Sequence, residues 1–196
     1  MTTRTLLSAG AADMTAPVPV TGRTLLIGLF GAVLFAGLTF VGASIRIPLQ
    51  PVPITLQTLF VLLAGAIIGP RAGSLGQGLY VGVGALGLPV FAGSVGGWAV
   101  VAGPTGGYLL GFLVAPLLVG SLIGRRDSLW WQPLVFWLGS LTILGLGILH
   151  LTVFYTHDLM QSLSVGYYPF VAGDLLKILA ATSIYRSYKA LRRSSR

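Results

Sequence analysis

The sequence contains no cysteine and no asparagine, and it has few charged residues. Without cysteine there is no disulfide framework, thiolate metal ligand or redox motif, and without asparagine there is no N-glycosylation site. Charged residues make up 8% of the 196-residue chain, against about 25% in an ordinary soluble domain. With 55% hydrophobic residues, the chain cannot cover its own surface with polar groups. The composition therefore predicts an integral membrane protein and excludes disordered, fibrous and disulfide-stapled classes.

The few charges are strongly unbalanced, with 12 Lys and Arg against 4 acidic residues and a formal net charge of +8. Such an excess can indicate nucleic-acid binding, but here the basic residues lie at the chain ends and in short clusters between apolar runs. This distribution is typical of membrane proteins. We therefore expect a lipid bilayer around the chain and no nucleic-acid partner.

The apolar runs predict an all-α membrane protein, a compact bundle of six transmembrane helices, because one crossing takes about 20 apolar residues. The run 72–124 is too long for one helix and suits two, with a break in the glycine- and proline-rich stretch 89–104. The second helix should begin near Ile54 and the fifth near Pro133. The uncharged runs are 24–45, 47–70, 72–124 and 128–157, and a last helix over 167–185 is interrupted by Asp174 and Lys177.

The basic residues also predict the orientation of the bundle. Six spans place almost all of them on one side and leave Arg46 alone on the other, so the positive-inside rule puts both termini in the cytoplasm. The expected organisation is an N-terminal cytoplasmic tail at 1–23, a transmembrane domain at 24–189 and a basic cytoplasmic tail at 190–196, in the cell membrane. The residues assigned to the cytoplasmic side are Arg4, Arg23, Arg71, Arg125, Arg126, Arg186, Lys189, Arg192, Arg193 and Arg196.

Motifs that would indicate an enzyme are missing or out of context. Residues 82–87 match the dinucleotide pattern GxGxxG, but they follow no strand and have no acidic residue at the required spacing, so their glycines indicate close helix packing. No ATP-binding P-loop and no GxSxG nucleophile occur. His150 and His157 lie two helical turns apart beside Asp158, yet a convincing third metal ligand is missing. We expect no enzymatic activity, no cofactor and no metal.

Asp174 and Lys177 are the only charges well inside a predicted span, and their spacing places them on one face of the last helix. A charge at membrane depth is costly, so each should face the bundle interior and have a partner. One interpretation is a purely structural ion pair. The other is a polar binding site in which Lys177 holds an anion and Asp174 accepts N–H donors. The residues alone do not identify the ligand.

Other residues could contribute to such a site. Gln77 and Tyr80 form a polar pair on the third helix, which either lines a cavity or hydrogen-bonds to another helix. Arg46 lies in the short proline-rich outer loop, where a solvated charge is the ordinary interpretation and a ligand gate the functional one.

The first helix carries a ridge of small residues, Gly28, Ala32 and Ala36, at intervals of one turn. Such a ridge lets another helix approach closely. The spacing does not distinguish packing within this bundle from docking of a second protein.

Taken together, several stretches resemble the BioY family, the biotin-specific substrate-binding (S) components of energy-coupling-factor (ECF) vitamin transporters. They stand in the family's order and extend over most of the chain, and the string at 103–112 is the most specific. The stretches are PVPITLQ at 51–57, LAGAIIGPR at 63–71, GLPVFA at 87–92, GPTGGYLLGF at 103–112 and GDLLK at 173–177.

The resemblance implies a six-helix membrane protein that captures biotin from outside. It implies that Asp174 and Lys177 contact biotin, and that the loop after the first span closes over the site. It also implies that Ala32 and Ala36 dock a membrane-embedded coupling (T) protein, whose ATPase subunits power release into the cytoplasm. Family members can use an asparagine in the site; this chain has none, so Gln77 or Tyr80 would take that place by helix face.

The chemistry of biotin suits these assignments. Lys177 suits its carboxylate and Asp174 the N–H groups of its ureido ring, although the sequence does not settle which end meets which residue. Arg46, brought in by loop closure, would offset the net negative charge of the occupied site. The apolar bicycle needs an apolar or aromatic wall, for which the candidates are Phe91, Tyr80 and Tyr108.

Other functions stay open at this point. The fold would also serve an S component for another small anionic vitamin, or a stand-alone secondary transporter with Asp174 as proton relay. An intramembrane enzyme with His150 as base is the weakest alternative, because no nucleophile is evident. The sequence also leaves open whether the protein acts as a homo-oligomer.

Overall fold

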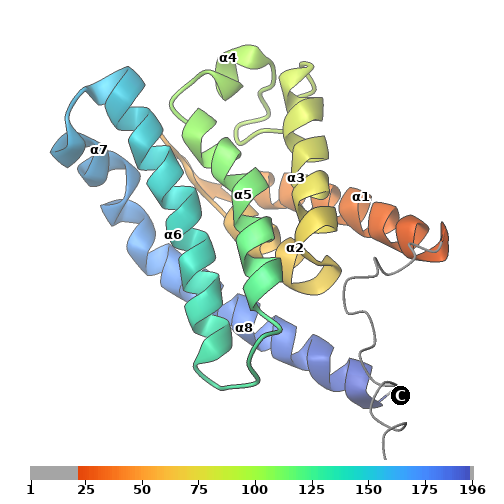
Figure 1. The fold of residues 1–196 in the computed structure, drawn as a ribbon. Coiled ribbons are helices and arrows are strands. Elements are labelled where there is room, and N and C mark those ends of the chain that lie inside the picture. Colours follow the sequence, from red (N-terminus) through yellow and green to blue (C-terminus); the bar gives the residue numbers. More distant parts are fainter. Residues whose placement is uncertain (1–21, 195–196) are drawn as a thin grey trace, which may run out of the picture.

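The computed structural model describes residues 22–194, which form an all-α bundle, as the sequence predicts (Figure 1). The predicted spans correspond to long helices, and shorter elements connect them. The long helices are α1 (Gly22–Ser44), α2 (Gln57–Ile68), α3 (Pro70–Ala85), α5 (Gly106–Leu122), α6 (Trp131–Leu151) and α8 (Val171–Ser194). The short elements are β1 (Arg46–Ile47), β2 (Ile54–Thr55), α4 (Trp98–Val101), a π-helix (Thr152–Thr156), α7 (Leu159–Gly166) and a 3₁₀ helix (Tyr168–Phe170).

The second long helix begins later than predicted, at Gln57 and not near Ile54. Ile54 and Thr55 instead form β2, which pairs antiparallel with β1 in the register Arg46 with Thr55 and Ile47 with Ile54. The hairpin is therefore part of the outer loop between α1 and α2, and the prolines of this loop keep it from becoming helical.

The break predicted inside the run 72–124 is confirmed, because α3 ends at Ala85 and α5 begins at Gly106. The loop between them makes turns that need glycine: Gly87 has φ +104° and Gly93 has φ +99°. Phe91, in this loop, packs its ring directly over Gly84 of α3, where a Cβ would collide with it. The glycines of 82–87 thus serve close packing at Gly84.

The small-residue ridge of α1 packs against α3 of the same chain. An added Cβ on Gly76 would lie 2.7 Å from the carbonyl oxygen of Ala32, and one on Gly28 would lie 3.9 Å from the Cβ of Ala72. Ala32 and Ala36 are buried at 5% and 9% exposure. Ala32 therefore packs against α3 inside the bundle. The assignment of Ala32 and Ala36 to docking of a coupling protein stays a prediction.

The last helix is longer than expected and starts later. It follows the 3₁₀ helix, begins at Val171 and continues to Ser194, so the predicted basic tail from 190 to 194 is helical. Its C-terminal turns are tied to the loop before α6, where Asp127 accepts hydrogen bonds from Lys189 at 2.8 Å and from Arg193 at 2.5 Å. The predicted tail at 1–23 lies outside the described residues, except for positions 22 and 23 in α1.

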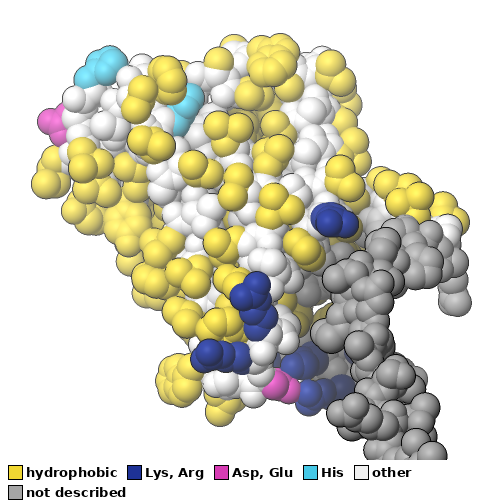
Figure 2. Space-filling model, in the orientation of Figure 1, with side chains coloured by type: hydrophobic (Ala, Val, Ile, Leu, Met, Phe, Trp, Pro, Cys, Tyr) yellow, Lys and Arg dark blue, Asp and Glu magenta, His cyan; other side chains and the backbone are white. Residues whose placement is uncertain are grey.

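The exterior of the bundle is apolar, and the core lies where α2, α5 and α6 meet, around Leu62, Val119, Phe136 and Ile143. Figure 2 shows apolar side chains over much of the visible face, with Lys and Arg gathered toward the C-terminal end and histidines at the opposite end. Two described stretches, Leu25–Ser44 and Trp131–Thr156, are long and apolar enough to cross a membrane. The other long helices are shorter or carry charge. The irregular segments beside α2, α3 and α5 line a cavity, which is where a bilayer tolerates non-helical backbone.

Candidate binding site

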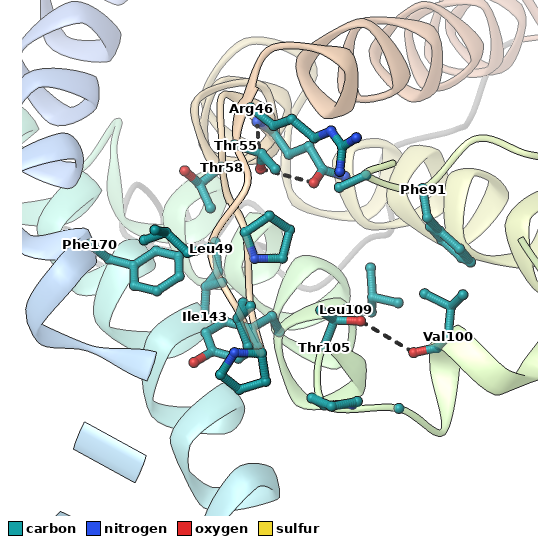
Figure 3. A pocket seen from close by; sticks show the side chains of 18 of the residues that line it. Arg46, Leu49, Thr55, Thr58, Phe91, Val100, Thr105, Leu109, Ile143 and Phe170 are labelled. Carbon is teal, nitrogen blue, oxygen red and sulfur yellow. Dashed lines mark hydrogen bonds between the residues drawn. The ribbon is translucent and has the colours of Figure 1, made fainter. Parts of the chain in front are cut away.

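A cavity of about 360 Å³ lies among the hairpin, the 86–105 loop and the helices α2, α5, α6 and α8 (Figure 3). Its volume is in the range of small-molecule sites, which run from about 300 to 1,000 Å³. The polar groups at its walls include Arg46, Thr55, Gln57, Thr58, Thr105, Asp174 and Lys177. Its apolar and aromatic walls include Leu49, Val52, Phe91, Val100, Tyr108, Leu109, Phe112, Ile143, Leu144 and Phe170.

Asp174 and Lys177 form a buried ion pair at this cavity. Lys177 Nζ lies 2.9 Å from Asp174 Oδ1, and the two residues are 6% and 7% exposed. Asp174 stands in the first turn of α8, where the N-terminal end of the helix dipole favours a carboxylate. The prediction that both charges face the interior is confirmed.

Neighbouring hydroxyl groups hold the pair from two other helices. Lys177 Nζ donates to Thr58 Oγ1 of α2 at 2.8 Å, and the hydroxyl of Ser140 on α6 donates to Asp174 Oδ2. An ammonium group has three donors, and within residues 22–194 two of them are used. The third N–H of Lys177, at the cavity wall, is therefore available to a ligand acceptor.

Arg46 brings a second cation to the cavity from β1. Its guanidinium lies against Gly93 of the opposite loop, because an added Cβ there would be 3.0 Å from one of its terminal nitrogens. The hairpin and the 86–105 loop thus meet over the cavity through an arginine and a glycine. Since Asp174 and Lys177 neutralise each other, Arg46 gives the site a net positive charge.

The aromatic wall is fixed from behind. Tyr108 stacks on Phe170 at a centroid distance of 6.1 Å and donates its hydroxyl to the carbonyl of Gly166 at 2.8 Å. Phe91 closes the other side and is 4% exposed. Phe91 and Tyr108, both predicted to line an apolar wall, therefore lie at the cavity.

Gln77 and Tyr80 lie outside the cavity, although their helix face suggested otherwise. Gln77 is fully buried and exchanges hydrogen bonds with Thr39 of α1, at 3.1 and 3.2 Å. Tyr80 lies behind Phe91, with ring centroids 5.6 Å apart, and its hydroxyl contacts Gln57. For Tyr80 the reason is that the loop carrying Phe91 folds back over α3 and places Phe91 at the cavity instead. Gln77 lies on the face of α3 that packs against α1.

Several polar residues of the site or its immediate support escaped sequence reasoning, among them Thr55 and Thr105 at the cavity wall. Gln57 and Thr58 line the cavity from the start of α2, and Ser140 supports Asp174 from α6. Gln57 closes the conspicuous PVPITLQ stretch at 51–57, so a signal for it was present. Nothing in the sequence pointed to Ser140, because a single serine in an apolar helix does not indicate a binding site.

His150 and His157 have separate environments. His150 Nε2 lies 3.1 Å from the carbonyl oxygen of Gly103, and its ring contacts Phe154 and Tyr155. His157 follows the π-helix in a left-handed conformation with φ +53°. Among residues 22–194, no three metal-ligating side chains gather into a cluster.

Comparison with known proteins places this architecture in a family. The BioY family model matches residues 29–194. The chain is 44% identical over 165 residues to the biotin transporter BioY of Thermotoga maritima, covering 83% of this chain and 96% of that one. It is 41% identical over 151 residues to the probable biotin transporter BioY of Pyrococcus horikoshii, covering 77% and 88%. A crystal structure of the S-component for biotin from an ECF-type ABC transporter superposes with a TM-score of 0.79 and 26% identity, covering 87% and 94%.

An apolar helical bundle that encloses a polar cavity under a hairpin defines a membrane protein that holds a small molecule. The family match is consistent with this description and extends over both the cavity walls and the ion pair. The chain belongs to the BioY family.

Proposed function

We propose that this protein captures biotin in the cavity and acts as the S component of an ECF-type transporter. It is a transporter component and not an enzyme. The observation that carries the proposal is the Asp174–Lys177 pair at the cavity wall, which leaves an ammonium N–H and carboxylate lone pairs for a ligand. Family membership supports the choice of biotin, because relatives over most of the chain's length are biotin transporters.

The cavity has the chemical groups that biotin requires. Because Lys177 Nζ and Asp174 Oδ1 lie 2.9 Å apart, the same end of biotin would meet both residues. Lys177 can donate to a ligand oxygen and Asp174 can accept from a ureido N–H, and charge-assisted hydrogen bonds are the stronger kind. Phe91 and Tyr108 provide aromatic surface for the bicycle. A bound carboxylate would add one negative charge, and Arg46 at the cavity wall offsets it.

The same proposal covers orientation and partners. The cavity would face the outside of the cell membrane and both termini the cytoplasm, since the basic residues gather at the C-terminal end and Arg46 lies at the cavity (Figure 2). A separate coupling protein with ATPase subunits would drive release. Ala32 and Ala36 are buried in this arrangement, so docking of the coupling protein on them would require α1 to move away from its neighbours first.

Binding of labelled biotin to the purified protein in lipid discs tests the proposal. Saturable binding should be displaced by unlabelled biotin but only weakly by lipoate, which shares the carboxylate-bearing chain and an apolar sulfur ring but has no ureido group. Absence of saturable biotin binding would overturn the proposal. Equal displacement by lipoate would overturn biotin selectivity and favour a site for small anionic vitamins generally.

A further inference from the structure

Tyr80 is connected to the cavity through a chain of hydrogen bonds that has a fixed direction. Gln57, which lines the cavity, donates its Nε2 to the Tyr80 hydroxyl at 2.6 Å. The Tyr80 hydroxyl donates to the carbonyl oxygen of Val90 at 3.0 Å. At the other end of the amide, Thr55 Oγ1 donates to Gln57 Oε1 at 2.9 Å.

The chemistry of these groups settles which way the Gln57 amide faces. A carbonyl oxygen only accepts, so the single hydroxyl hydrogen of Tyr80 is committed to Val90. Tyr80 can then only accept from Gln57, and only the nitrogen of the amide can donate. In the flipped amide, two oxygen lone pairs would face each other, or the Val90 carbonyl would lose its hydrogen bond.

Tyr80 is the hydrogen-bond donor that satisfies the Val90 carbonyl. Within residues 22–194, no other hydrogen bond reaches the Val90 carbonyl. Thr55 does not fix the orientation of the Gln57 amide, because its hydroxyl can donate to the amide oxygen or accept from the amide nitrogen. Tyr80 is 3% exposed and is held edge-to-face against Phe91, so its hydroxyl has little freedom to move away.

We propose that Tyr80 is a positioning residue: it fixes the orientation of the Gln57 amide, and so determines which ligand groups this wall of the cavity accepts. The proposal rests on biotin as the ligand and adds a specificity determinant to that function. Tyr80 itself does not touch the ligand.

The fixed amide suits a cyclic urea. Within the described chain, Gln57 keeps one N–H and one Oε1 lone pair without a partner. A ureido group offers the complementary groups, a carbonyl acceptor beside an N–H donor. Because the Gln57 nitrogen is held on the Tyr80 side, its free N–H favours a hydrogen-bond acceptor on the ligand at that point. A ligand donor at the same point would face an N–H group and find no acceptor.

The test compares biotin with 2-iminobiotin, in which an imino nitrogen replaces the ureido oxygen and turns an acceptor into a donor. The ratio of their dissociation constants is measured at one pH for wild type and for Tyr80→Phe, so the ligand's own charge cancels between variants. We expect the preference for biotin to fall by about tenfold in Tyr80→Phe, the factor that one mismatched buried hydrogen bond produces. Phenylalanine keeps the ring against Phe91, and thermal stability and elution profile check the fold.

Tyr155→Phe is the matched control, since Tyr155 also donates its hydroxyl to a loop carbonyl, that of Ala102, but has no contact with Gln57. Its ratio should equal that of wild type. A Tyr80→Phe ratio within about twofold of wild type, with biotin still bound, would overturn the proposal without touching the proposed function. If the wild-type protein did not bind biotin, the proposed function itself would be rejected.

A second variant covers the case in which Tyr80→Phe does not fold. Gln57→Glu places a carboxylate, which has no N–H, at the same wall. The preference for biotin over 2-iminobiotin should fall in this variant as well. An unchanged ratio would show that no Gln57 donor faces the ligand and would equally overturn the proposal.

Discussion

Ser140 on α6 donates its hydroxyl hydrogen to Asp174 on α8, on the side of the carboxylate opposite to Lys177. Each oxygen of Asp174 therefore has a donor of its own, one neutral and one charged. This arrangement stabilises a charge that would otherwise be costly in the interior of a membrane protein. It also keeps the carboxylate oriented toward the cavity.

Ser140→Ala should weaken biotin binding and lower stability. The change leaves a buried carboxylate with one hydrogen bond fewer, and a bond to a charged group contributes about 1.5–3 kcal/mol. We expect affinity to fall by about tenfold or more in an equilibrium binding assay. Thr142→Ala is the control, because within the described residues Thr142 donates only to the carbonyl of Leu138 in its own helix. Equal effects of the two variants would contradict a specific role for Ser140.

Arg46→Gln should reduce the affinity for biotin while leaving the fold intact. Arg46 is exposed, and it brings positive charge to a site whose other two charges cancel. The loss should grow as the salt concentration is lowered, because screening of a partly exposed charge is then weakest. Arg71→Gln, an exposed arginine away from the cavity, should bind as the wild type does. An affinity of Arg46→Gln equal to that of wild type would remove Arg46 from the site.

Gly84→Ala and Gly82→Ala should have opposite effects, although both lie in α3. A Cβ at Gly84 collides with the ring of Phe91, whereas one at Gly82 meets no described residue within 4 Å. Overpacking typically costs about 1–3 kcal/mol, while alanine in a helix is favoured over glycine by about 1 kcal/mol. We expect Gly84→Ala to lower both the melting temperature and the affinity for biotin. Gly82→Ala should leave the melting temperature unchanged or raise it. Wild-type affinity in Gly84→Ala would show that Phe91 is not a fixed wall.

Asp127 predicts a pH dependence at the C-terminal end of the bundle. Hydrogen bonds from Lys189 and Arg193 hold the pKa of Asp127 below its usual 3.8. A carboxyl whose folded pKa is depressed stabilises the fold above its unfolded pKa, and this contribution is lost as the pH falls through the folded value. As the pH falls through the depressed pKa of Asp127, its contacts to the last turns of α8 should therefore be lost. Hydrogen exchange of residues 186–194 would detect this, and in Asp127→Asn the exchange should already be fast at neutral pH.

The sequence predicted the features that depend on composition and local pattern. The helix class, the break between α3 and α5 and the inward-facing Asp174 and Lys177 follow from apolar length, glycine content and the cost of buried charge. What could not be predicted depends on how distant segments meet. Gln77 hydrogen-bonds to Thr39 because its face of α3 packs against α1, and Tyr80 lies behind Phe91 because the 86–105 loop folds back over α3. The periodicity of α3 alone does not predict either contact.

The small-residue ridge of α1 is a second case in which the sequence predicted a contact but not its partner. Its spacing correctly indicated a close helix contact, but not which helix makes it. Gly76 on α3 provides the complementary surface to Ala32, so the ridge is used inside the chain. A one-helix pattern cannot identify its partner unless the partner's own pattern is considered with it.

The central claim is that the Asp174–Lys177 pair is a ligand site and not only a structural ion pair. Binding of labelled biotin in lipid discs should fall by at least about tenfold in Lys177→Ala, equivalent to about 1.4 kcal/mol. Because alanine leaves Asp174 unpaired, Asp174→Asn combined with Lys177→Met removes both charges and separates lost folding from lost binding. If folded protein with either change binds biotin as tightly as wild type does, the pair is structural and the account of the site is wrong.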